Sequence, residues 1–345
     1  MNDSDHKESP EYLKMSMGAA LTLGFKKGRF YRNAKLHCIN LLQVYSGGCS
    51  ASCAYCGLSG KRSKNNGKKS FIRVDWPTLF IDDIIEKMKI NKHKFSRICI
   101  SMITRKLASW DVVFIIEKIT AALDTPISVL ICPTITNGDD LVRFKEKGVD
   151  KIGVAIDAAT RQLFEKYRGN GVGGPHQWET YWDIYKKSFE IFGYRNVGVH
   201  LIVGLGESEK EMAHTIQNAY DLGGGTHLFS FYPETGSQME ICQPPPIEQY
   251  RRIQLARYLI DEGISQFADF HFNNSGQIID FGISISDLNG IIHSGQPFMT
   301  SGCRGNDGKV ACNRPYANFP PPNIRNYPFA LNDEDIEQIE KQLNL

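Results

Sequence analysis

The chain has 345 residues, more than most single domains, and 41% of them are hydrophobic, which is ample for a buried core. Its formal net charge of +2 at pH 7 gives no reason to expect binding to nucleic acid or to a membrane, because phosphate-binding surfaces normally show a basic excess. No apolar run approaches the roughly 18 residues of a membrane span, and residues 1–10 lack the apolar segment of a signal peptide, so we expect a cytoplasmic protein.

After a polar start, the sequence alternates between apolar runs and amphipathic stretches. Residues 1–10 are expected to form a disordered tail, and residues 11–24 a helix followed by an extended linker. Apolar runs of strand length are Ile39–Tyr45, Arg97–Met102, Ile127–Cys132, Lys151–Ile156, Val197–Val203, His227–Tyr232 and Phe267–Phe272. Helical spacing is clearest in Trp76–Lys89, Trp110–Leu123, Asp139–Lys147, Trp178–Phe192, Ser208–Leu222 and Ile247–Glu262. Buried strands that alternate with helices predict a parallel sheet covered on both faces.

This alternation places the chain in the α/β class and leaves a doubly wound sheet or a (β/α) barrel open. The length of the chain favours a barrel, full or partial, of the TIM type. We expect residues 1–35 to form an N-terminal tail and helix, and residues 36–300 to form the barrel, with Gln296–Thr300 as its last strand. Residues 301–345 are expected to form a cysteine-containing C-terminal tail, whose aromatic residues favour an ordered cover over the active site.

Nine cysteines are scattered along the chain, which fits a reducing cytoplasm better than a disulfide framework. Three of them, Cys49, Cys53 and Cys56, lie in a glycine-rich loop directly after the first apolar run. Three thiolates at this spacing can bind three irons of a [4Fe–4S] cluster and leave the fourth iron open for a substrate. A zinc site would need a fourth protein ligand, and no His or Cys follows at a suitable spacing.

The C-x3-C-x2-C spacing after the first strand resembles the signature of the radical SAM superfamily, with Tyr55 at the position of an aromatic residue that contacts adenine. The resemblance implies that Cys49, Cys53 and Cys56 hold a [4Fe–4S] cluster and form the catalytic centre. It also implies that S-adenosylmethionine (SAM) chelates the open iron and is cleaved to a 5′-deoxyadenosyl radical.

By the same resemblance, further residues at strand ends are expected to contact SAM. Ser101 ends the second strand, where the family often has a Gly-Gly-Glu-like segment, so Ser101 and backbone carbonyls would receive the methionine amino group. Asp157 suits a ribose hydroxyl, or equally the N-cap of the following helix. Arg168 or His176 would meet the methionine carboxylate, unless Arg168 is merely a solvated side chain. Gly204 belongs to a V-G-L-G-E segment similar to that of biotin synthase, and is expected near the adenine.

The remaining cysteines suggest a second iron–sulfur cluster. Cys303 and Cys312 bracket a turn rich in Gly, Asn and Asp, and could also be two free thiols. Cys99 and Cys132 align with two thiolate ligands of the second cluster in biotin synthase, although its other two ligands have no counterpart here. As an alternative to that position, Cys132 could join the tail cysteines. Cys38 ranks lower, because about seven residues of strand, at ~3.3 Å each, would put it some 20 Å below the active face.

Within the superfamily, the chain is most similar to the biotin synthase and lipoyl synthase group, and especially to the biotin-synthase-like subunits of two-protein lipoyl synthases. The segments that carry this resemblance are Tyr45–Leu58, Gly174–Trp182, Val203–Glu207, Phe231–Gly236 and Ser301–Phe329. The resemblance implies radical sulfur insertion into an octanoyl chain on a lipoyl carrier domain, with a second cluster as the sulfur source.

The partners implied are the octanoylated carrier domain, a paralogous radical SAM protein and an electron donor such as ferredoxin or flavodoxin. Two alternatives remain open. One is another reaction of the biotin-synthase-like group, such as a maturase in hydrogenase cofactor assembly or a small-molecule mutase. The other is a non-enzymatic iron–sulfur scaffold protein, which would hold the cluster without releasing 5′-deoxyadenosine.

Overall fold

The centre of the molecule is a curved, mostly parallel sheet. A computed structural model describes residues 7–62, 71–315 and 319–343. Its parallel strands are β2 (Cys38–Gln43), β4 (Arg97–Ser101), β5 (Ile127–Ile131), β6 (Val149–Asp157), β7 (Val197–Val203) and β8 (Gly225–Ser230). Two antiparallel strands, β1 (Tyr12–Met15) and β3 (Thr78–Phe80), extend the edge beside β2. The order in this part of the chain is β3-β1-β2-β4-β5-β6-β7-β8, so the fold is α/β and the barrel is partial.

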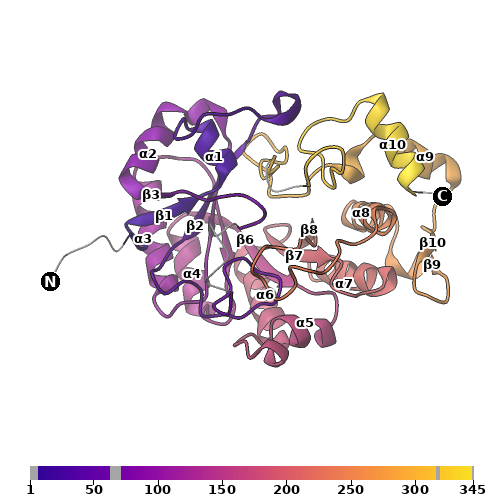
Figure 1. Ribbon diagram of the computed structural model, residues 1–345, viewed down its shortest axis with the longest axis horizontal. Coiled ribbons are helices and arrows are strands. Elements are labelled where there is room, and N and C mark those ends of the chain that lie inside the picture. Colours follow the sequence, from indigo (N-terminus) through magenta and orange to yellow (C-terminus); the bar gives the residue numbers. More distant parts are fainter. Residues whose placement is uncertain (1–6, 63–70, 316–318, 344–345) are drawn as a thin grey trace.

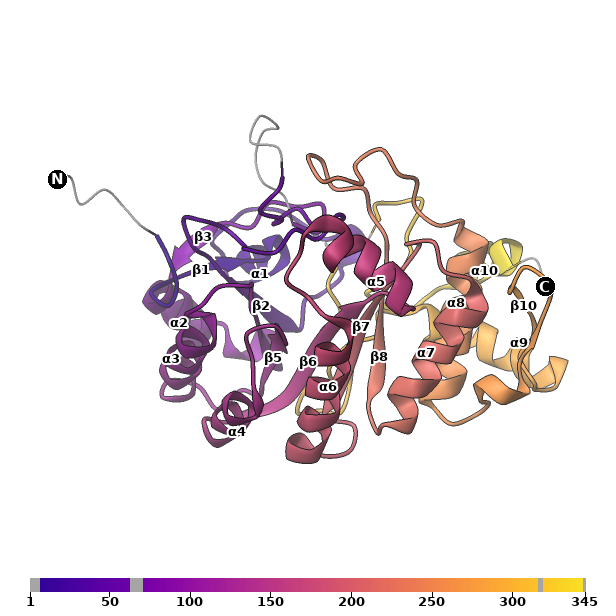
Figure 2. The same ribbon diagram turned by 90° about the horizontal axis from the view of Figure 1, so that it is seen from below.

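Helices cover the outer face of the parallel strands (Figure 2). The connecting helices are α2 (Ile81–Ile90), α3 (Ala108–Thr120), α4 (Gly138–Glu146), α5 (Arg161–Tyr167), α6 (Trp178–Phe192), α7 (Glu209–Asp221) and α8 (Ile247–Asp261). Capping boxes define where two of them begin, Asn137 with Asp140 at α4 and Ser208 with Glu211 at α7. The remaining helices are α1 (Met17–Thr22), α9 (Ile285–His293) and α10 (Asp333–Leu343).

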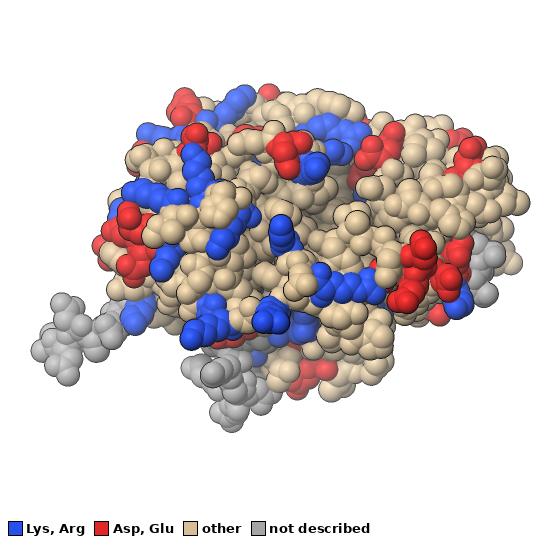
Figure 3. Space-filling view, turned by 90° about the horizontal axis from the view of Figure 1, so that it is seen from above, with Lys and Arg blue, Asp and Glu red and all other residues tan. Residues whose placement is uncertain are grey.

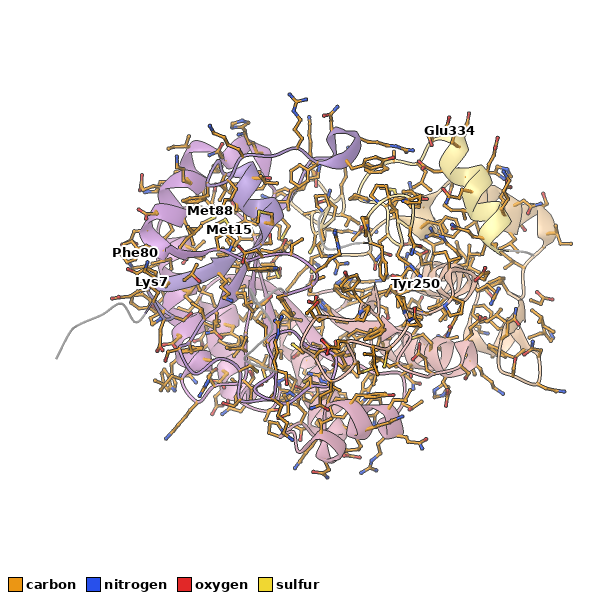
Figure 4. All side chains as sticks on the ribbon, in the orientation of Figure 1. Lys7, Met15, Phe80, Met88, Tyr250 and Glu334 are labelled. Carbon is orange, nitrogen blue, oxygen red and sulfur yellow. The ribbon has the colours of Figure 1, made fainter. Side chains whose placement is uncertain are left out.

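The hydrophobic core lies between the sheet and these helices. Strand residues such as Ile98, Val129 and Val154 are fully buried, as expected for parallel strands covered on both faces. Met15 of β1 and Met88 of α2 belong to the same core, and Figure 4 shows them close together. Burial of these side chains provides the main favourable term in folding.

The structure corrects three of the elements expected from sequence. Residues 11–24 form β1 and the short helix α1 instead of one helix, because Leu13 and Lys14 pair with both β2 and β3. Phe267–Phe272 is no barrel strand: it contains a 3-10 turn (Phe267–Asp269) and β9 (His271–Phe272), which pairs with β10 (Ile278–Asp280). Gln296–Phe298 is also a 3-10 turn.

The C-terminal tail lies between the two open edges of the partial barrel. In Figure 1 the yellow segment runs between α1 on one side and α8 on the other. Asn313 donates to the carbonyl of Lys35, just before β2, at 2.6 Å. Ser301 accepts a hydrogen bond from the amide of Leu228 in β8 at 3.0 Å. The tail therefore connects β8 to β2 where further strands would stand in a closed barrel.

Ser9, in the tail expected to be disordered, is buried beside Val44 just after β2, and residues 1–6 lie outside the described part. The amide of Val44 donates to the Ser9 hydroxyl at 3.0 Å, and Ser9 is 8% exposed. Within the described residues, no helix is both long and apolar enough to cross a membrane. The face in Figure 3 carries Lys and Arg side chains separated by acidic and uncharged residues.

Candidate functional site

The loop after β2 holds Cys49, Cys53 and Cys56 at the carboxyl end of the strands. Two backbone hydrogen bonds attach this loop to its surroundings, Ser50 N to Thr104 O at 3.0 Å and Ala54 N to Tyr167 O at 2.8 Å, and a third, Gly60 N to Ala51 O at 2.8 Å, closes the loop on itself. Active sites of barrels are assembled at this end of the sheet. The loop is thus fixed from both sides of the barrel mouth.

The sulfurs of this loop are in a setting suited to metal ligands. The amide of Ala51 points to Cys49 Sγ at 3.4 Å, and that of Leu58 to Cys56 Sγ at 3.4 Å. Burial raises the pKa of the Cys53 thiol to about 11, and burial likewise raises the pKa of Cys56. Two buried thiols so disposed are neutral by themselves, and a bound metal would deprotonate them.

Tyr55, Asp157 and Arg168 form one hydrogen-bonded group beside Cys53. The Tyr55 hydroxyl donates to Asp157 Oδ2 at 2.6 Å, and Arg168 Nη1 lies 2.9 Å from the same oxygen. A register shift between Ala155 and Asp157 at the end of β6 turns the aspartate toward this group. Since Thr160, not Asp157, caps α5, the alternative of Asp157 as an N-cap is wrong.

Arg168 is held deeper in the barrel than a solvated helix-end residue would be. It is 5% exposed and donates to the carbonyl of Ile156 at 3.1 Å and to the Tyr181 hydroxyl at 3.2 Å. His176 Nδ1 lies 3.0 Å from the same hydroxyl, and burial lowers the pKa of His176 to about 2. This ring is therefore neutral at physiological pH.

Of two further residues expected to contact SAM, Ser101 lies at the cavity and Gly204 does not. Ser101 lines the cavity described below, at the end of β4. Gly204 does not belong to the lining: its φ is 107°, and a Cβ there would meet Pro245 Cδ at 2.6 Å. The amides of Gly204 and Leu205 instead donate to the buried carboxylate of Glu207 at 2.6 and 2.9 Å. The V-G-L-G-E segment thus forms a turn closed by its own glutamate.

Cys132 lies on the side of the first cysteine group. Its sulfur is 3.3 Å from the Thr104 hydroxyl and 4.0 Å from the Tyr181 hydroxyl, and burial raises the pKa of this thiol. The tail cysteines have other neighbours, so the expectation that Cys132 joins Cys303 and Cys312 is wrong. The reason is that Cys132 follows β5, on the Arg168 side of the barrel interior.

A second group of cysteines assembles lower in the barrel from strands and tail. Its members are Cys38 in β2, Cys99 in β4, and Cys303 and Cys312 in the tail. Cys38 hydrogen-bonds Cys312, and Asn40 Nδ2 lies 3.7 Å from the sulfur of each. Cys303 Sγ lies 3.8 Å from His227 Nε2 of β8.

Positive charges face this second group from three elements, Arg97 of β4, Lys151 of β6 and Arg314 of the tail. Hydrogen bonding by Cys38 lowers the pKa of Cys312 to about 6, while burial and the same bond raise the pKa of Cys38. Burial raises the pKa of Cys99 to about 12 and that of Cys303 to about 11.

The first cysteine group and three members of the second, Cys99, Cys303 and Cys312, line one cavity of about 300 Å³ inside the barrel. Its lining includes Cys49, Cys53, Cys56, Tyr55, Asp157 and Arg168 from the first site, Cys99, Cys303 and Cys312 from the second, and apolar side chains such as Leu42, Ile103 and Phe229. The sequence predicted most members of the two cysteine groups. Cys38 was ranked low, because functional cysteines were expected only at the carboxyl ends of the strands. Asn40, two residues after Cys38 and therefore on the same face of β2, was the signal available.

The residues present fit an iron–sulfur cluster better than a single ion. Among the described residues, no three His, Cys, Asp or Glu side chains converge closely enough to hold one metal ion. Sulfurs that bind one zinc at about 2.3 Å lie only about 3.8 Å apart, whereas the thiolates around a cluster stand further from one another. The Cys49–Cys56 loop, with three thiols on one cavity wall, matches three ligands and an open fourth position.

Residues 44–219, about half of the chain, match the radical SAM superfamily. No curated protein is matched in sequence. The maturase of the [FeFe]-hydrogenase, HydG, has a similar fold, with a TM-score of 0.51 and 13% identity over 71% of this chain and 54% of HydG. The radical SAM methyltransferase TsrM from Kitasatospora setae gives a TM-score of 0.41 and 13% identity over 81% of this chain and 49% of TsrM. The chain therefore spans about half the length of these structures.

Proposed function

Because this chain belongs to the radical SAM superfamily, we propose that it is a sulfur-insertion enzyme of the lipoyl synthase type. Its substrate would be an octanoyl chain displayed on a lipoyl carrier domain. A paralogous radical SAM protein would act with it, and ferredoxin or flavodoxin would supply electrons. When bound, the first cluster and SAM supply the radical that removes hydrogen from the chain, and a second cluster supplies the sulfur.

The observation that supports this proposal is that the first cysteine group lines the same cavity as Cys99, Cys303 and Cys312 of the second. A carbon from which hydrogen is removed must also meet the sulfur donor, so the two groups have to flank one space. Apolar walls around Leu42, Ile103 and Phe229 suit a saturated hydrocarbon chain and exclude water from a reactive intermediate.

In this proposal, the chain's own residues hold SAM in a fixed orientation. Asp157, already an acceptor for Tyr55, has a further lone-pair capacity for a ribose hydroxyl. Ser101 and nearby backbone carbonyls would accept from the methionine amino group. Arg168 pairs with Asp157 at 2.9 Å and would hold its carboxylate in a fixed orientation beside the cavity.

The test is to incubate the reconstituted protein anaerobically with SAM, a reductant and an octanoylated lipoyl domain, with and without a paralogous partner. We expect release of 5′-deoxyadenosine and a mass gain of sulfur on the domain. A matched control is the Cys49→Ala variant, in which both should disappear, since it loses one ligand of the first cluster.

The outcomes separate the alternatives. Release of 5′-deoxyadenosine without any sulfur gain, with the partner added, would exclude lipoyl-type insertion and favour another reaction of the same group, such as a maturase or mutase. Absence of 5′-deoxyadenosine from a fully reconstituted protein would favour an iron–sulfur scaffold.

A further inference from the structure

Two of the second-group cysteines are brought together by a hairpin in the tail. Arg304 and Val310 form an antiparallel bridge, and the amides of Ala311 and Cys312 donate to the carbonyl of Cys303 at 2.9 and 3.2 Å. Cys303 and Cys312 therefore lie side by side at the open end of this hairpin. The backbone holds these two thiols as neighbours although eight residues of sequence lie between them.

The hairpin is fixed on the strands that carry the other two cysteines. Arg97 Nε donates to the carbonyl of Arg304 at 2.6 Å. Asn313 accepts from the amide of His37 at 3.3 Å and donates to the carbonyl of Lys35. Cys38, the first residue of β2, follows His37 directly. Cys99 lies opposite Asn40 in the pairing of β2 with β4. Four thiols from three separate stretches of chain thus meet inside the barrel.

The surroundings of the four thiols are those of an anionic centre. Arg97 is 1% exposed and forms two hydrogen bonds of 2.6 Å to Asp150, so one carboxylate balances it, while Lys151 and Arg314 add further positive charge. Asn40 directs its amide group at two of the sulfurs, and buried His227 has an Nδ1 without a partner among the described residues. Neutral thiols in an ordinary core would not need these cations and donors, whereas a cluster of net negative charge would.

We propose that Cys38, Cys99, Cys303 and Cys312 are the four ligands of a second iron–sulfur cluster, which forms where the tail hairpin meets β2 and β4. Two ligands come from the barrel and two from the tail, so the cluster also joins the tail to the barrel. Four thiolates are the common ligand set of both [4Fe–4S] and [2Fe–2S] clusters. Ser301, whose hydroxyl accepts from Leu228, and Cys132, which faces Thr104, are outside this set.

The alternatives for four close thiols fit less well. The described cysteines are all free thiols, so no disulfide occupies the site. A single zinc ion would require three converging ligands, which the described residues do not provide. The role of this cluster as a sulfur source rests on the proposed function. The presence of the cluster does not.

The experiment isolates the second site in a Cys49→Ala/Cys53→Ala/Cys56→Ala background, after anaerobic reconstitution with iron and sulfide. We expect about four, or for a smaller cluster about two, irons per chain with equal sulfide. Adding Cys38→Ala should reduce both nearly to zero and abolish the visible absorption and the Mössbauer signal of the cluster. Adding Cys132→Ala or Cys242→Ala, the matched controls, should leave them unchanged.

Full iron and sulfide in the Cys38→Ala variant, loss in the Cys132→Ala variant, or binding of zinc in place of iron would each overturn the proposal. Far-UV circular dichroism shows whether Cys38→Ala still folds. If it does not, the Cys303→Ala/Cys312→Ala pair in the tail hairpin replaces it and must lose the cluster. The proposed function fails separately, when the cluster is present and no sulfur is transferred.

Discussion

Asp157 adopts a left-handed backbone conformation, with a φ of 65°, at the last position of β6. Aspartate and asparagine tolerate this conformation better than most residues, and it redirects the side chain out of the alternation of the strand. Its carboxylate accepts from Tyr55 and pairs with Arg168, both nearly enclosed in the barrel. Strain at the strand end is thus associated with the position expected to contact SAM.

Removing the Asp157 carboxylate should destabilise the fold as well as the site. In Asp157→Ala, the buried Arg168 loses its ion pair, and the small residue is strained at positive φ, so we expect a loss of about 3–5 kcal/mol. Asp157→Asn keeps the backbone preference and one acceptor oxygen, and should lose less. Urea unfolding of the metal-free protein measures both, with the exposed Asp183→Ala as control. Equal stability of Asp157→Ala and wild type would contradict this role.

Glu207 makes the stability depend on pH. Burial raises its pKa from 4.5 to about 7, although the amides of Gly204 and Leu205 act in the opposite direction. The folded state therefore keeps a proton that the unfolded chain releases. The contribution of Glu207 to the free energy of unfolding is fully present below about pH 4.5. It is lost as the pH rises to about 7, which lowers the stability by up to about 3 kcal/mol.

Glu207→Gln should remove this part of the pH dependence. Its amide cannot ionise, so the free energy of unfolding of the variant minus that of wild type should increase between pH 5 and about 7. Urea titrations of the metal-free protein across this range provide the measurement, and the exposed Glu337→Gln serves as control. Parallel curves for wild type and Glu207→Gln would argue against the shifted pKa.

At the scale of elements, the tail hairpin depends on Asn313. This side chain is 7% exposed and bonds three backbone groups, those of Lys35, His37 and Pro328. A shorter side chain would leave these groups buried without partners, at about 1–3 kcal/mol each where water cannot reach them. Asn313 therefore holds the tail to the start of β2.

We expect Asn313→Ala to loosen the tail more than it affects the sheet. Hydrogen exchange of amides in the hairpin, such as Ala311 and Cys312, should become at least tenfold faster, while exchange in β5 stays slow. The exposed Asn306→Ala, in the turn of the same hairpin, is the matched control. Unchanged exchange in Asn313→Ala would show that other contacts hold the tail.

The central elements were predictable because local pattern and tertiary environment agree. The run Ile127–Cys132 is apolar except for Ser128 and contains the largely buried β5, and Ser208 with Glu211 marks the start of α7. Phe267–Phe272 also contains Asp269 and His271, and only its β9 part pairs, with β10, because strand partners depend on how the whole chain folds back. Residues 11–24 were misassigned for the same reason, since β1 exists through its pairing with β2 and β3.

At the scale of the whole molecule, sequence predicted the first cysteine group and only part of the second. Cys49, Cys53 and Cys56 lie within one loop, so their spacing alone brings them together. Cys38 and Cys312 are brought into contact by the path of the tail, which enters the barrel between β8 and β2. No local pattern records that path. Tyr250 of α8, whose hydroxyl donates to Asn326 at 2.9 Å, is one of the contacts that direct it (Figure 4).

The shared cavity predicts that substrate access and SAM cleavage can be separated. Ser230 ends β8 and lines the cavity, and its buried hydroxyl has no hydrogen-bond partner in the described part of the chain. Ser230→Phe would add a ring to the wall of this cavity, without removing any cysteine. If the protein carries out the proposed sulfur insertion, sulfur transfer to the octanoyl carrier should fall at least tenfold, while reductant-dependent release of 5′-deoxyadenosine stays within about twofold of wild type.

Ser230→Ala is the size-matched control, and it should retain both reactions, because the hydroxyl it removes has no partner to lose. Iron and sulfide content, measured for both variants, verifies that the cysteine groups still bind their clusters. If Ser230→Phe transfers sulfur normally, the octanoyl chain does not occupy this cavity. If it loses 5′-deoxyadenosine release as well, Ser230 lies against SAM, and the space between the two cysteine groups is smaller than a substrate chain requires.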